Sequence, residues 1–372
     1  MSNFSKKYNN FLAPEAVIKI DEKKLSDYHI YFTSLEVDQS FDGADTFSFS
    51  ISDAIDMEFE PKPEHKKLFD LGNKVEIYMG YAEGGEEKLK LLFVGLITNV
   101  NWNFQEENYL DISIEGQDYS FLLMKHHYKK PIQEESISSI VEKLIEEVYK
   151  PTFEETDIEQ TDVVYNQTRN QDISDYLFIK SLAEKVGYEF YIDKKRLVFK
   201  SPPKDQKSSF ILHYGQEILS FNPELDISKE VSKVRVIGLE FSSDNQPIVG
   251  EAELERKKDD FNNSDTGIKT LLRKLNSIEY EVREPVKTVA EAKQRAKSLL
   301  RNFSLNYFKV KIKLIGIPDL KPGITISIAG LGKRFSRDYY VEKVVHSISG
   351  QGYESTISVR GNSNSFKILE GG

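Results

Sequence analysis

The stretch Gly72–Gly80, GNKVEIYMG, decides the fold because its outline returns about 250 residues later as Gly323–Gly330, GITISIAG. In both stretches a glycine precedes alternating apolar residues, which is the pattern of a half-buried β-strand. Further matches follow in the same order: Phe93-Val94 and Ile97 with Tyr340-Val341 and Val344, then Ile112, Ile114 and Gly116 with Ile357, Val359 and Gly361. The pattern indicates two related antiparallel β-barrels in one chain. Two unrelated antiparallel meanders can share such spacing, so the residues alone leave both interpretations open.

Strand-like runs fill the chain from Ala16 to Tyr128. They lie at residues 30–37, 46–51, 75–79, 89–97 and 110–114, with breaks at Asp42-Gly43 and Gly84-Gly85. Glycine tolerates the positive φ of hairpin turns, so Gly84-Gly85 predicts a long hairpin. Residues 1–128 are therefore predicted to form the first antiparallel barrel or sandwich.

A helix-plus-hairpin module is predicted for residues 129–205. Apolar residues recur at helical spacing from Ser136, a suitable N-cap, to Lys150. A second helix is predicted from about Ile173 to Val186, opened by Asp172 and closed by Gly187. Alternating apolar residues at 188–192 and 197–199 then predict a small hairpin.

The second barrel is assigned to residues 206–242 and 305–362, with Val231–Leu239 as its clearest strand. Residues 243–304 are expected to form an insertion, first a polar, solvated loop and then a helix that packs on the module. Thr288 and Glu291 have the spacing of a capping box at the start of that helix. Residues 363–372 are expected to be a loose C-terminal tail.

Composition excludes several classes of protein. The 372 residues are 39% hydrophobic, 30% charged and 12% aromatic, which is typical of globular domains and favours β-sheet. A net charge of −10 argues against direct nucleic-acid recognition, which needs a basic surface. The absence of Cys excludes disulfides and thiolate chemistry. No run of about 18 apolar residues predicts a membrane span, and residues 1–10 do not resemble a secretory signal.

Candidate catalytic and ligand-binding groups have simpler explanations. His126-His127 has no nearby Cys, His or carboxylate cluster and is interpreted as a polar strand end. Residues 330–334, GLGKR, lack the spacing of a phosphate loop and have no helix predicted after them, so they are interpreted as a turn, as is Gly350-Gln351-Gly352. Acid pairs at 106–107, 146–147 and 154–155 arise by chance in a chain with 60 acidic residues. The sequence therefore predicts no catalytic, metal-binding or cofactor-binding residue.

Two stretches resemble the hub proteins of contractile phage tails. The first is 166–192, NQTRNQDISDYLFIKSLAEKVGYEFYI, with Gln171, Asp172, Leu182-Ala183-Glu184 and Gly187 at the matching positions, followed by Leu197-Val198-Phe199. The second is 316–323, GIPDLKPG, followed by Phe335-Ser336, Tyr339-Tyr340-Val341 and Val345-His346. The resemblance is to the late control protein D family, to which the tail hub of phage T4 and the N-terminal part of the type VI secretion spike are also similar. It covers residues 17–362.

This resemblance implies an assembly. The barrels would be tail-tube-like, and a homotrimer would present a ring of six barrels to a sixfold tail tube and threefold symmetry to a spike. Type VI proteins continue into an OB-fold and a needle, whereas this chain stops near Gly372, so the spike is expected to be a separate trimeric protein. Other implied partners are a tail tube or tube-initiator protein, the tape-measure protein and baseplate wedge proteins.

The resemblance also implies structural roles for particular residues. Pro322 and Gly323 would shape the start of a strand and Gly330 a turn. The spike-side tail would contain Ser363, Asn364, Ser365 and Phe366. The expected protein is a non-enzymatic baseplate hub of a contractile phage tail, a tail-like bacteriocin or a related contractile injection system, assembled in the bacterial cytoplasm. The alternative is a tail-associated cell-wall hydrolase or glycan-binding module.

Overall fold

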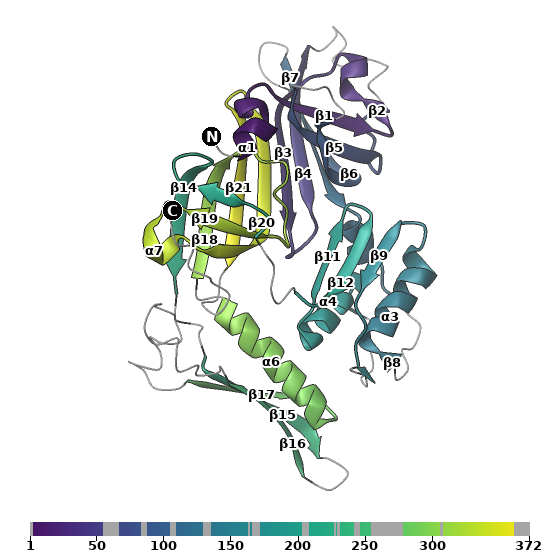
Figure 1. Cartoon of the computed structure of the whole chain (residues 1–372). Coiled ribbons are helices and arrows are strands. Elements are labelled where there is room, and N and C mark those ends of the chain that lie inside the picture. Colours follow the sequence, from purple (N-terminus) through teal and green to yellow (C-terminus); the bar gives the residue numbers. More distant parts are fainter. Residues whose placement is uncertain are drawn as a thin grey trace.

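The computed structural model describes residues 3–54, 67–82, 88–104, 109–128, 135–162, 164–165, 172–202, 208–226, 228, 231–241, 246–253, 278–305 and 308–360. About half of these residues lie in strands, and most of the strand pairs are antiparallel, so the expected β-rich fold is confirmed. Figure 1 shows a strand-rich upper part, a helix-and-hairpin unit below it on the right, and a long helix on a small sheet at the bottom.

One 13-stranded sheet carries both strand-rich regions of the described chain. Its first strand set is β1 (Pro14–Ile20), β2 (Lys23–Lys24), β3 (Phe32–Ser40), β4 (Thr46–Ala54), β5 (Lys74–Tyr81), β6 (Lys90–Phe104) and β7 (Tyr109–Asp118). Its second strand set is β13 (Ile211–His213), β14 (Ile218–Leu225), β18 (Phe308–Ile315), β19 (Thr325–Ala329), β20 (Asp338–Ser349) and β21 (Gly352–Arg360). Buried and exposed residues alternate along these strands, and the buried ones form one apolar core shared by both sets.

The two strand sets have the same strand order. The first runs β3-β4-β7-β6-β5-β1 and the second runs β14-β18-β21-β20-β19-β13. One difference is that β1 is antiparallel to β5, whereas β13 is parallel to β19. The sets join where β20 pairs with β3, from Lys343 opposite Ser40 to Ser349 opposite Ser34. This ladder is called the intrachain seam below.

Local irregularities recur at equivalent points of the two sets. The register shifts between Phe32 and Ser34 in β3, and between Ile218 and Ser220 in β14. It also shifts between Ile97 and Asn99 in β6, and between Val341 and Lys343 in β20. Two unrelated meanders would have no reason to share bulges, so the repeat is a property of the fold.

The glycines that open β5 and β19 also correspond. Gly72 has φ +91° and its N–H donates to the Ile97 carbonyl at 2.8 Å. Gly323 has φ +86° and its N–H donates to the Val341 carbonyl at 2.9 Å. Ile97 therefore corresponds to Val341, so the sequence match of Ile97 with Val344 is wrong by three residues. The cause is that β6 and β20 differ in length before the bulge. The match of Gly116 with Gly361 is wrong by two residues. Gly116 pairs with Ile97 as Val359 pairs with Val341, so Gly116 corresponds to Val359.

The helix-plus-hairpin module has its own apolar core. Its elements are β8 (Glu135–Ser136), α3 (Ile137–Leu144) with a π-helical turn at Ile145–Tyr149, β9 (Glu155–Ile158), β10 (Val164–Tyr165), α4 (Asp175–Val186), β11 (Glu189–Asp193) and β12 (Arg196–Lys200). Ser136 caps α3, and Gly187, with φ +74°, closes α4, as predicted. Asp172 does not open α4; the Ser174 side chain accepts the capping hydrogen bond from the Leu177 N–H.

A third unit corrects the assignment of Val231–Leu239 to the second barrel. This region forms β15 (Lys233–Phe241), which lies between β16 (Pro247–Glu253) and β17 (Glu279–Glu284) in a separate sheet covered by α6 (Val289–Leu305). The segment predicted as a solvated loop thus contributes two strands. Strand β17, EYEVRE, is mostly exposed, so it lacks the apolar alternation by which strands are recognised.

Helix α6 begins as predicted, but it packs mainly on the β15/β16 sheet and only secondarily on the module. Thr288 Oγ1 accepts from the Glu291 N–H at 3.1 Å, and the Glu291 carboxylate accepts from the Lys287 N–H at 2.9 Å. The helix contacts the module through Ser298 Oγ, which donates to the Glu184 carbonyl at 2.6 Å. Its main apolar contact is with the β15/β16 face.

Three short helices lie where no helix was predicted: α1 (Asn3–Lys7), α2 (Ser120–Lys125) and α7 (Gly332–Phe335), with 3-10 turns at Asn9–Phe11 and Leu25–Tyr28. Helix α2, SFLLMK, is a short apolar run without room for a helical period, so its sequence pattern does not distinguish it from a strand. Helix α7 begins at Gly332, inside the segment 330–334 that was expected to be a turn with no helix after it. No helix in the described part of the chain is both long and apolar enough to cross a membrane.

Several predicted features lie outside the described residues. They are the Gly84-Gly85 hairpin, the acid pair at 106–107, the loop residues 255–265 and the tail residues Ser363, Asn364, Ser365 and Phe366.

Gly250 should be intolerant of even one methyl group. A Cβ at Gly250 would lie 2.1 Å from the Ala292 backbone carbon, because α6 crosses β16 there. We expect Gly250→Ala to destabilise this unit by about 1–3 kcal/mol, as overpacking does, measured by hydrogen exchange of β16 and α6. The control is Gly350→Ala, where a Cβ meets nothing within 4 Å. Equal effects of the two variants would contradict this packing.

Candidate assembly surface

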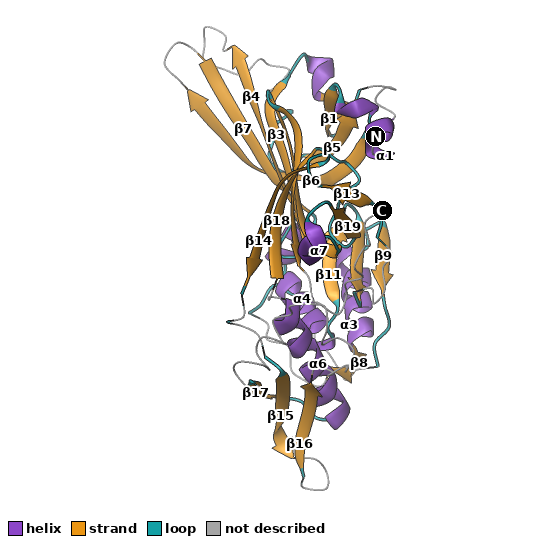
Figure 2. Cartoon of the chain, turned by 60° about the vertical axis from the view of Figure 1, so that its left-hand side comes forward, coloured by secondary structure: helices purple, strands orange, loops and turns teal. Residues whose placement is uncertain are grey.

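The outward face of the joined sheet is polar across eight neighbouring strands, β14-β18-β21-β20-β3-β4-β7-β6. Figure 2 shows these strands running past the seam, with β3, β4 and β7 reaching toward one end and β14 and β18 toward the other. Outward residues of the first set include Ser34, Glu36, Asp38, Thr46, Ser48, Ser50, Ser52, Asn99, Asn101, Asn103, Asp111, Ser113, Glu115 and Gln117. Those of the second include Ser220, Asn222, Glu224, Lys309, Lys311, Lys313, Lys343, Val345, Ser347, Ser349, Glu354, Thr356, Ser358 and Arg360. In these two groups Val345 is the one apolar side chain.

The charges on this face are divided between the two strand sets. The named charges of the first set are all acidic: Glu36, Asp38, Asp111 and Glu115. The second set has five basic side chains, three of which are the β18 lysines Lys309, Lys311 and Lys313, and two acidic ones, Glu224 and Glu354, so it is basic on balance. The Lys343 ammonium meets the Asp38 carboxylate at 2.5 Å across the intrachain seam, so opposite charges meet where the sets join.

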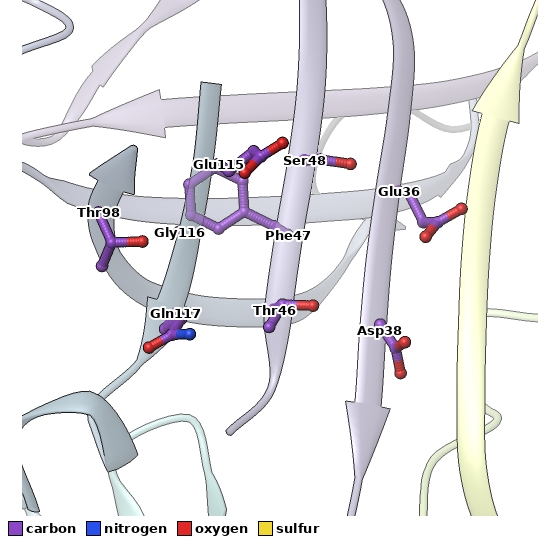
Figure 3. Close-up of a pocket in the computed structure, with 9 residues that line it drawn as sticks. All are labelled: Glu36, Asp38, Thr46, Phe47, Ser48, Thr98, Glu115, Gly116 and Gln117. Carbon is purple, nitrogen blue, oxygen red and sulfur yellow. The ribbon is translucent and has the colours of Figure 1, made fainter. Parts of the chain in front are cut away.

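A shallow hollow of about 280 Å³ lies on the acidic part of this face. Figure 3 shows Glu36, Ser48 and Glu115 projecting from neighbouring strands, and the ladders place them in one row. The Phe47 ring lies against Gly116, where a Cβ would come within 2.3 Å of it. Glycine at position 116 therefore allows the Phe47 ring to pack directly against the β7 backbone beneath the hollow.

The hollow has the charge but not the environment of a glycosidase site. Glu36 and Glu115 are two strand spacings apart, roughly 10 Å, near the upper end for an inverting pair. Such a pair needs one acid whose pKa is raised by burial, yet both side chains are exposed. Asp38, the third carboxylate, pairs with Lys343. The row is better suited to a hydrated wall than to proton transfer.

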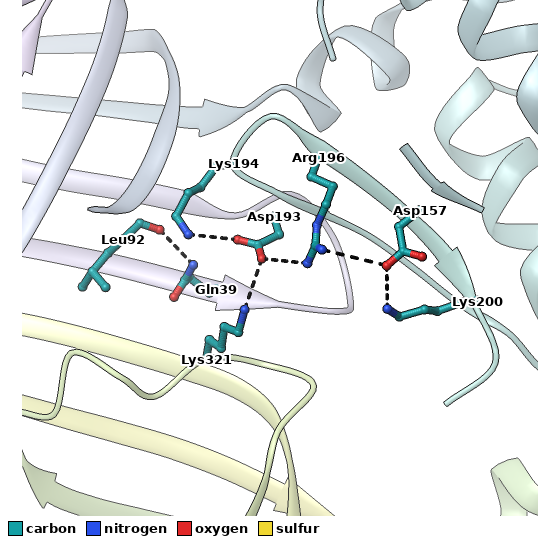
Figure 4. Close-up of polar contacts among 8 residues, drawn as sticks. All are labelled: Gln39, Leu92, Asp157, Asp193, Lys194, Arg196, Lys200 and Lys321. Carbon is teal, nitrogen blue, oxygen red and sulfur yellow. Dashed lines mark hydrogen bonds and ion pairs between the residues drawn. The ribbon is translucent and has the colours of Figure 1, made fainter. Parts of the chain in front are cut away.

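The module is attached to the sheet by a cluster of charges around Asp193 (Figure 4). The Asp193 carboxylate contacts Lys194 at 3.2 Å, Lys321 at 3.3 Å and Arg196 at 3.4 Å. Burial opposes ionisation of Asp193, but Lys194 and Lys321 hold its pKa below the ordinary value. Arg196 and Lys200 also contact Asp157, so one network spans the module and the loop before β19. Nearby, Gln39 Nε2 donates to the Leu92 carbonyl at 3.0 Å.

Aromatic side chains complete this joint. The rings of Phe41 and Tyr191 lie 4.7 Å apart, and the Tyr340 hydroxyl donates to Glu189 at 2.7 Å. Burial raises the pKa of Glu189, although the Tyr340 hydrogen bond opposes this. The Gly43 N–H donates to the Tyr176 hydroxyl at 3.0 Å. The module is thus held by both strand sets.

The predicted turn residues lie in two separate places. Pro322 lines a small hollow at the joint together with Tyr191 and Lys321. A Cβ on Gly323 would lie 3.3 Å from the Phe41 ring. Gly330, with φ +89°, lies after β19 beside Tyr214 instead. The structure thus brings Pro322 and Gly323 together with the joint and leaves Gly330 apart.

His346 holds the loop that leads to Pro322. It is fully buried, and burial lowers its pKa to about 4, so the ring is neutral. Its Nε2 donates to the Leu320 carbonyl at 3.1 Å, and the Tyr353 hydroxyl donates to its Nδ1 at 2.8 Å. The carboxylate of Asp319 in the same loop contacts Lys7, Tyr8 and Lys90. The loop therefore connects α1 and both strand sets.

Two carboxylic acids are buried beneath the joint. Asp45 Oδ1 accepts from the Ser40 N–H, and Asp118 Oδ1 accepts from the Ser120 N–H, each at 2.9 Å. Burial raises the pKa of Asp118 to about 7, and burial together with the neighbouring Asp118 raises the pKa of Asp45. Sequence reasoning missed both residues, because neither belongs to a motif.

Of the two adjacent histidines, His126 has a structural partner. His126 follows α2 rather than a strand, and its Nδ1 lies 2.6 Å from the Asp175 carboxylate. Asp175 also accepts from the Tyr128 N–H and the Tyr149 hydroxyl. Within the described residues, no three His, Asp or Glu side chains converge to hold a metal.

Comparison with known proteins identifies the fold. A family model described as the Alg8 N-terminal domain matches residues 13–350, and no curated protein matches the sequence. The tail protein from Neisseria meningitidis MC58 has a TM-score of 0.70 at 13% identity, covering 94% of this chain and 97% of that chain. The 43 kDa tail protein of prophage MuSo2 from Shewanella oneidensis has a TM-score of 0.68 at 13% identity, covering 95% and 100%.

A third structure comes from a secretion system. The E. coli c3393 protein is a component of the type VI secretion system with structural similarity to the T4 bacteriophage tail proteins gp27 and gp5. Its TM-score is 0.59 at 12% identity, covering 92% of this chain and 76% of that chain. The chain therefore has the fold of phage tail and type VI secretion proteins.

The buried acid Asp118 should make stability depend on pH. Its pKa rises from 3.8 to about 7 on folding, so the folded state binds the extra proton and stability falls as the pH rises between these values. We expect Asp118→Asn to raise the melting temperature at pH 7.5, by roughly 2 °C or more, and to have little effect at pH 4. Exposed Asp70→Asn is the control. A gain that is the same at both pH values would contradict the assignment.

Proposed function

The chain belongs to the Alg8 N-terminal domain family. From its repeated strand order and its similarity to tail proteins, we propose that it is a structural baseplate hub protein of a contractile injection particle. The particle is a contractile phage tail, a tail-like bacteriocin or a related injection system. The protein acts as a homotrimer that adapts a sixfold tail tube to a threefold spike, and it is a hub of the late control protein D type. It needs no cofactor and catalyses no reaction.

The repeated strand order carries this proposal. One chain contains the order β3-β4-β7-β6-β5-β1 and its repeat β14-β18-β21-β20-β19-β13 in a single sheet. Three chains would therefore supply six similar units while keeping threefold symmetry in the module and in the β15–β17 unit. A symmetry mismatch between tube and spike requires such an object. The similarity of nearly the whole chain to two tail proteins supports the same assignment.

In the proposed ring, the polar outward face of the sheet is suited to line the central channel. Hydroxyl, amide and charged side chains cover it, with Val345 as the one apolar member of the residues named above. A wall of this kind stays hydrated and offers no apolar patch for passing cargo. Its acidic and basic parts would alternate around the ring. Direct nucleic-acid recognition is not part of the proposal.

The implied partners follow from the two ends of such a ring. A tail tube or tube-initiator protein would contact the sixfold end, and a separate trimeric spike protein the threefold end. Tape-measure and baseplate wedge proteins are further candidates. Assembly takes place in the bacterial cytoplasm, and the finished protein is part of the virion tail or tail-like particle.

Copy number tests this function directly. We expect native mass spectrometry of the purified full chain, or of a complex with its spike, to show three copies, because three double units close a ring of six. Peptidoglycan release by the same sample is the assay for the alternative hydrolase. A stable monomer that does not join a spike or tube, or a chain that cleaves peptidoglycan, would contradict the proposal.

The C-terminal tail is proposed to lie on the spike side. We expect deletion of residues 363–372, which removes Ser363, Asn364, Ser365 and Phe366, to weaken capture of the co-expressed spike by ten-fold or more while the trimer persists. The control is replacement of the same residues by a Gly-Ser segment of equal length, which should weaken capture as much if the side chains matter. Unchanged spike capture by both variants would count against the tail's role.

A further inference from the structure

Two buried acids, Asp45 and Asp118, lie where the module docks on the sheet. Asp45 directly precedes β4 and Asp118 ends β7, and the Asp118 N–H donates to the Asp45 carbonyl at 2.9 Å. Asp45 is 8% exposed and Asp118 is 3% exposed. One oxygen of each carboxyl accepts a backbone N–H, from Ser40 and from Ser120. Both side chains are therefore held in place by the backbone at the end of the first strand set.

The module covers this acid pair. The Tyr176 hydroxyl of α4 accepts from the Gly43 N–H at 3.0 Å, and the Tyr176 side chain is buried. Asp193 of β11 lines a cavity of about 20 Å³ together with Gln39 and Asp45, here called the joint cavity. Figure 4 shows Gln39 on β3 close to Asp193 on the module hairpin. Movement of the module away from the sheet would therefore admit water to the pair.

The joint cavity is short of hydrogen-bond donors. Gln39 is buried, and its Oε1 has no hydrogen-bond partner among the described residues, while its Nε2 donates to the Leu92 carbonyl. The Asp193 carboxylate is already held by the cations of its own cluster. An ionised Asp45 would add one more acceptor, whereas a protonated Asp45 adds an O–H donor. The surroundings therefore favour the neutral acid at Asp45.

The charges around the pair also oppose its ionisation. Asp118 and Asp193 both act on Asp45 with negative charge. Burial raises the pKa of Asp118 to about 7, and burial together with these two acids raises the pKa of Asp45. The other titratable or charged side chains at the joint are Asp42 with Lys180 and Arg360, Lys194, Arg196 and Lys321 around Asp193, Tyr176, Tyr191, Lys90, and Glu189 with Tyr340.

We propose that the joint is a pH-sensitive switch, in which docking of the module on the sheet requires the Asp45–Asp118 pair to keep a proton. With the proton in place, the pair is buried under the module at little cost. With both carboxylates ionised, two like charges would have to stay out of water beside Asp193. The joint then opens, and water reaches the acids. This switch operates within one chain and does not rest on the proposed trimer.

The direction of the pH dependence follows from the proton that docking takes up. The docked pKa of Asp118 is above its ordinary value of 3.8, so its contribution to docking is complete below that value and is lost as the pH rises through about 7. Asp193 has a lowered pKa and stays ionised over this range. Glu189 at the same joint has a raised pKa, so its contribution has the same sign and must be separated experimentally.

Hydrogen exchange of the full chain tests the switch. Exchange of Gly43 and of β11 is followed from about pH 5 to about pH 8 and divided by exchange of the double variant Asp45→Asn with Asp118→Asn at the same pH. Asn keeps the oxygen that accepts the backbone N–H and stays neutral, so this variant should remain docked throughout. We expect the quotient to rise at least ten-fold, because one linked proton contributes up to ten-fold per pH unit.

Two controls assign the effect to the pair and to the joint. Glu189→Gln removes a buried acid of the joint outside the pair, so its quotient should still rise at least ten-fold. Amides of β18 and β21 lie outside the joint and report global unfolding, so they should exchange more slowly than the joint at each pH.

A quotient that stays within about two-fold over this pH range would overturn the switch. Loss of the rise in Glu189→Gln would also overturn it, because the effect would then belong to Glu189. Equal protection of the joint and of β18 and β21 would do the same, because the whole chain would be opening.

If the double variant does not fold, infrared spectroscopy of the wild-type chain and of Asp45→Asn at neutral pH replaces it. We expect the band of a protonated carboxyl in the wild type and a weaker band in the variant. A wild-type chain without this band, or equal bands in the two chains, would overturn the switch.

None of these results depends on copy number, so they leave the proposed trimer to its own test.

Discussion

The antiparallel ladder between β20 and β3 is the interaction on which the rest of the structure depends. It joins residues about 300 positions apart, including the Lys343–Asp38 ion pair, and makes two strand sets into one sheet with one core. Because the sets are locked side by side, the loop at 316–323 can be held from both: His346 and Tyr353 hold it from the second set, and Lys90 contacts Asp319 from the first. The module in turn attaches to this loop through Asp193 and Lys321. Loss of the ladder would leave the module without a fixed position.

The same ladder places the two strand sets of one chain side by side, which is what the proposed trimer requires to combine sixfold and threefold symmetry. A duplicated fold whose halves pair edge to edge places two similar strand sets side by side in one chain. In the proposed trimer these strand sets would supply six similar units. The insertions do not repeat: the module follows the first set, and the β15–β17 unit with α6 interrupts the second. In the proposed trimer, sixfold character in the sheet and threefold character outside it would follow from where these insertions interrupt the chain.

Sequence reasoning could find features whose signal is local. Alternation in 72–80 and 323–330, the cap at Ser136, the end at Gly187 and the capping box at Thr288 each depend on a few neighbouring residues, and the structure has them. Features that depend on distant partners were missed or misplaced. Val231–Leu239 is a strong strand, but its sheet is defined by pairing with β16 and β17, and the exposed, charged residues of β17 hide the periodicity of that strand. Asp193 and Lys321 are 128 residues apart, and the division of charge on the outer face emerges only from the strand register.

The central claim is that one chain contributes two equivalent units to a closed ring. The most direct measurement is a cryo-electron microscopy reconstruction of the assembled full chain with no symmetry imposed. The account predicts a threefold map in which the sheet alone approaches sixfold symmetry. A map in which the two strand sets of one chain occupy unrelated positions, with no sixfold arrangement of the sheet, would contradict it.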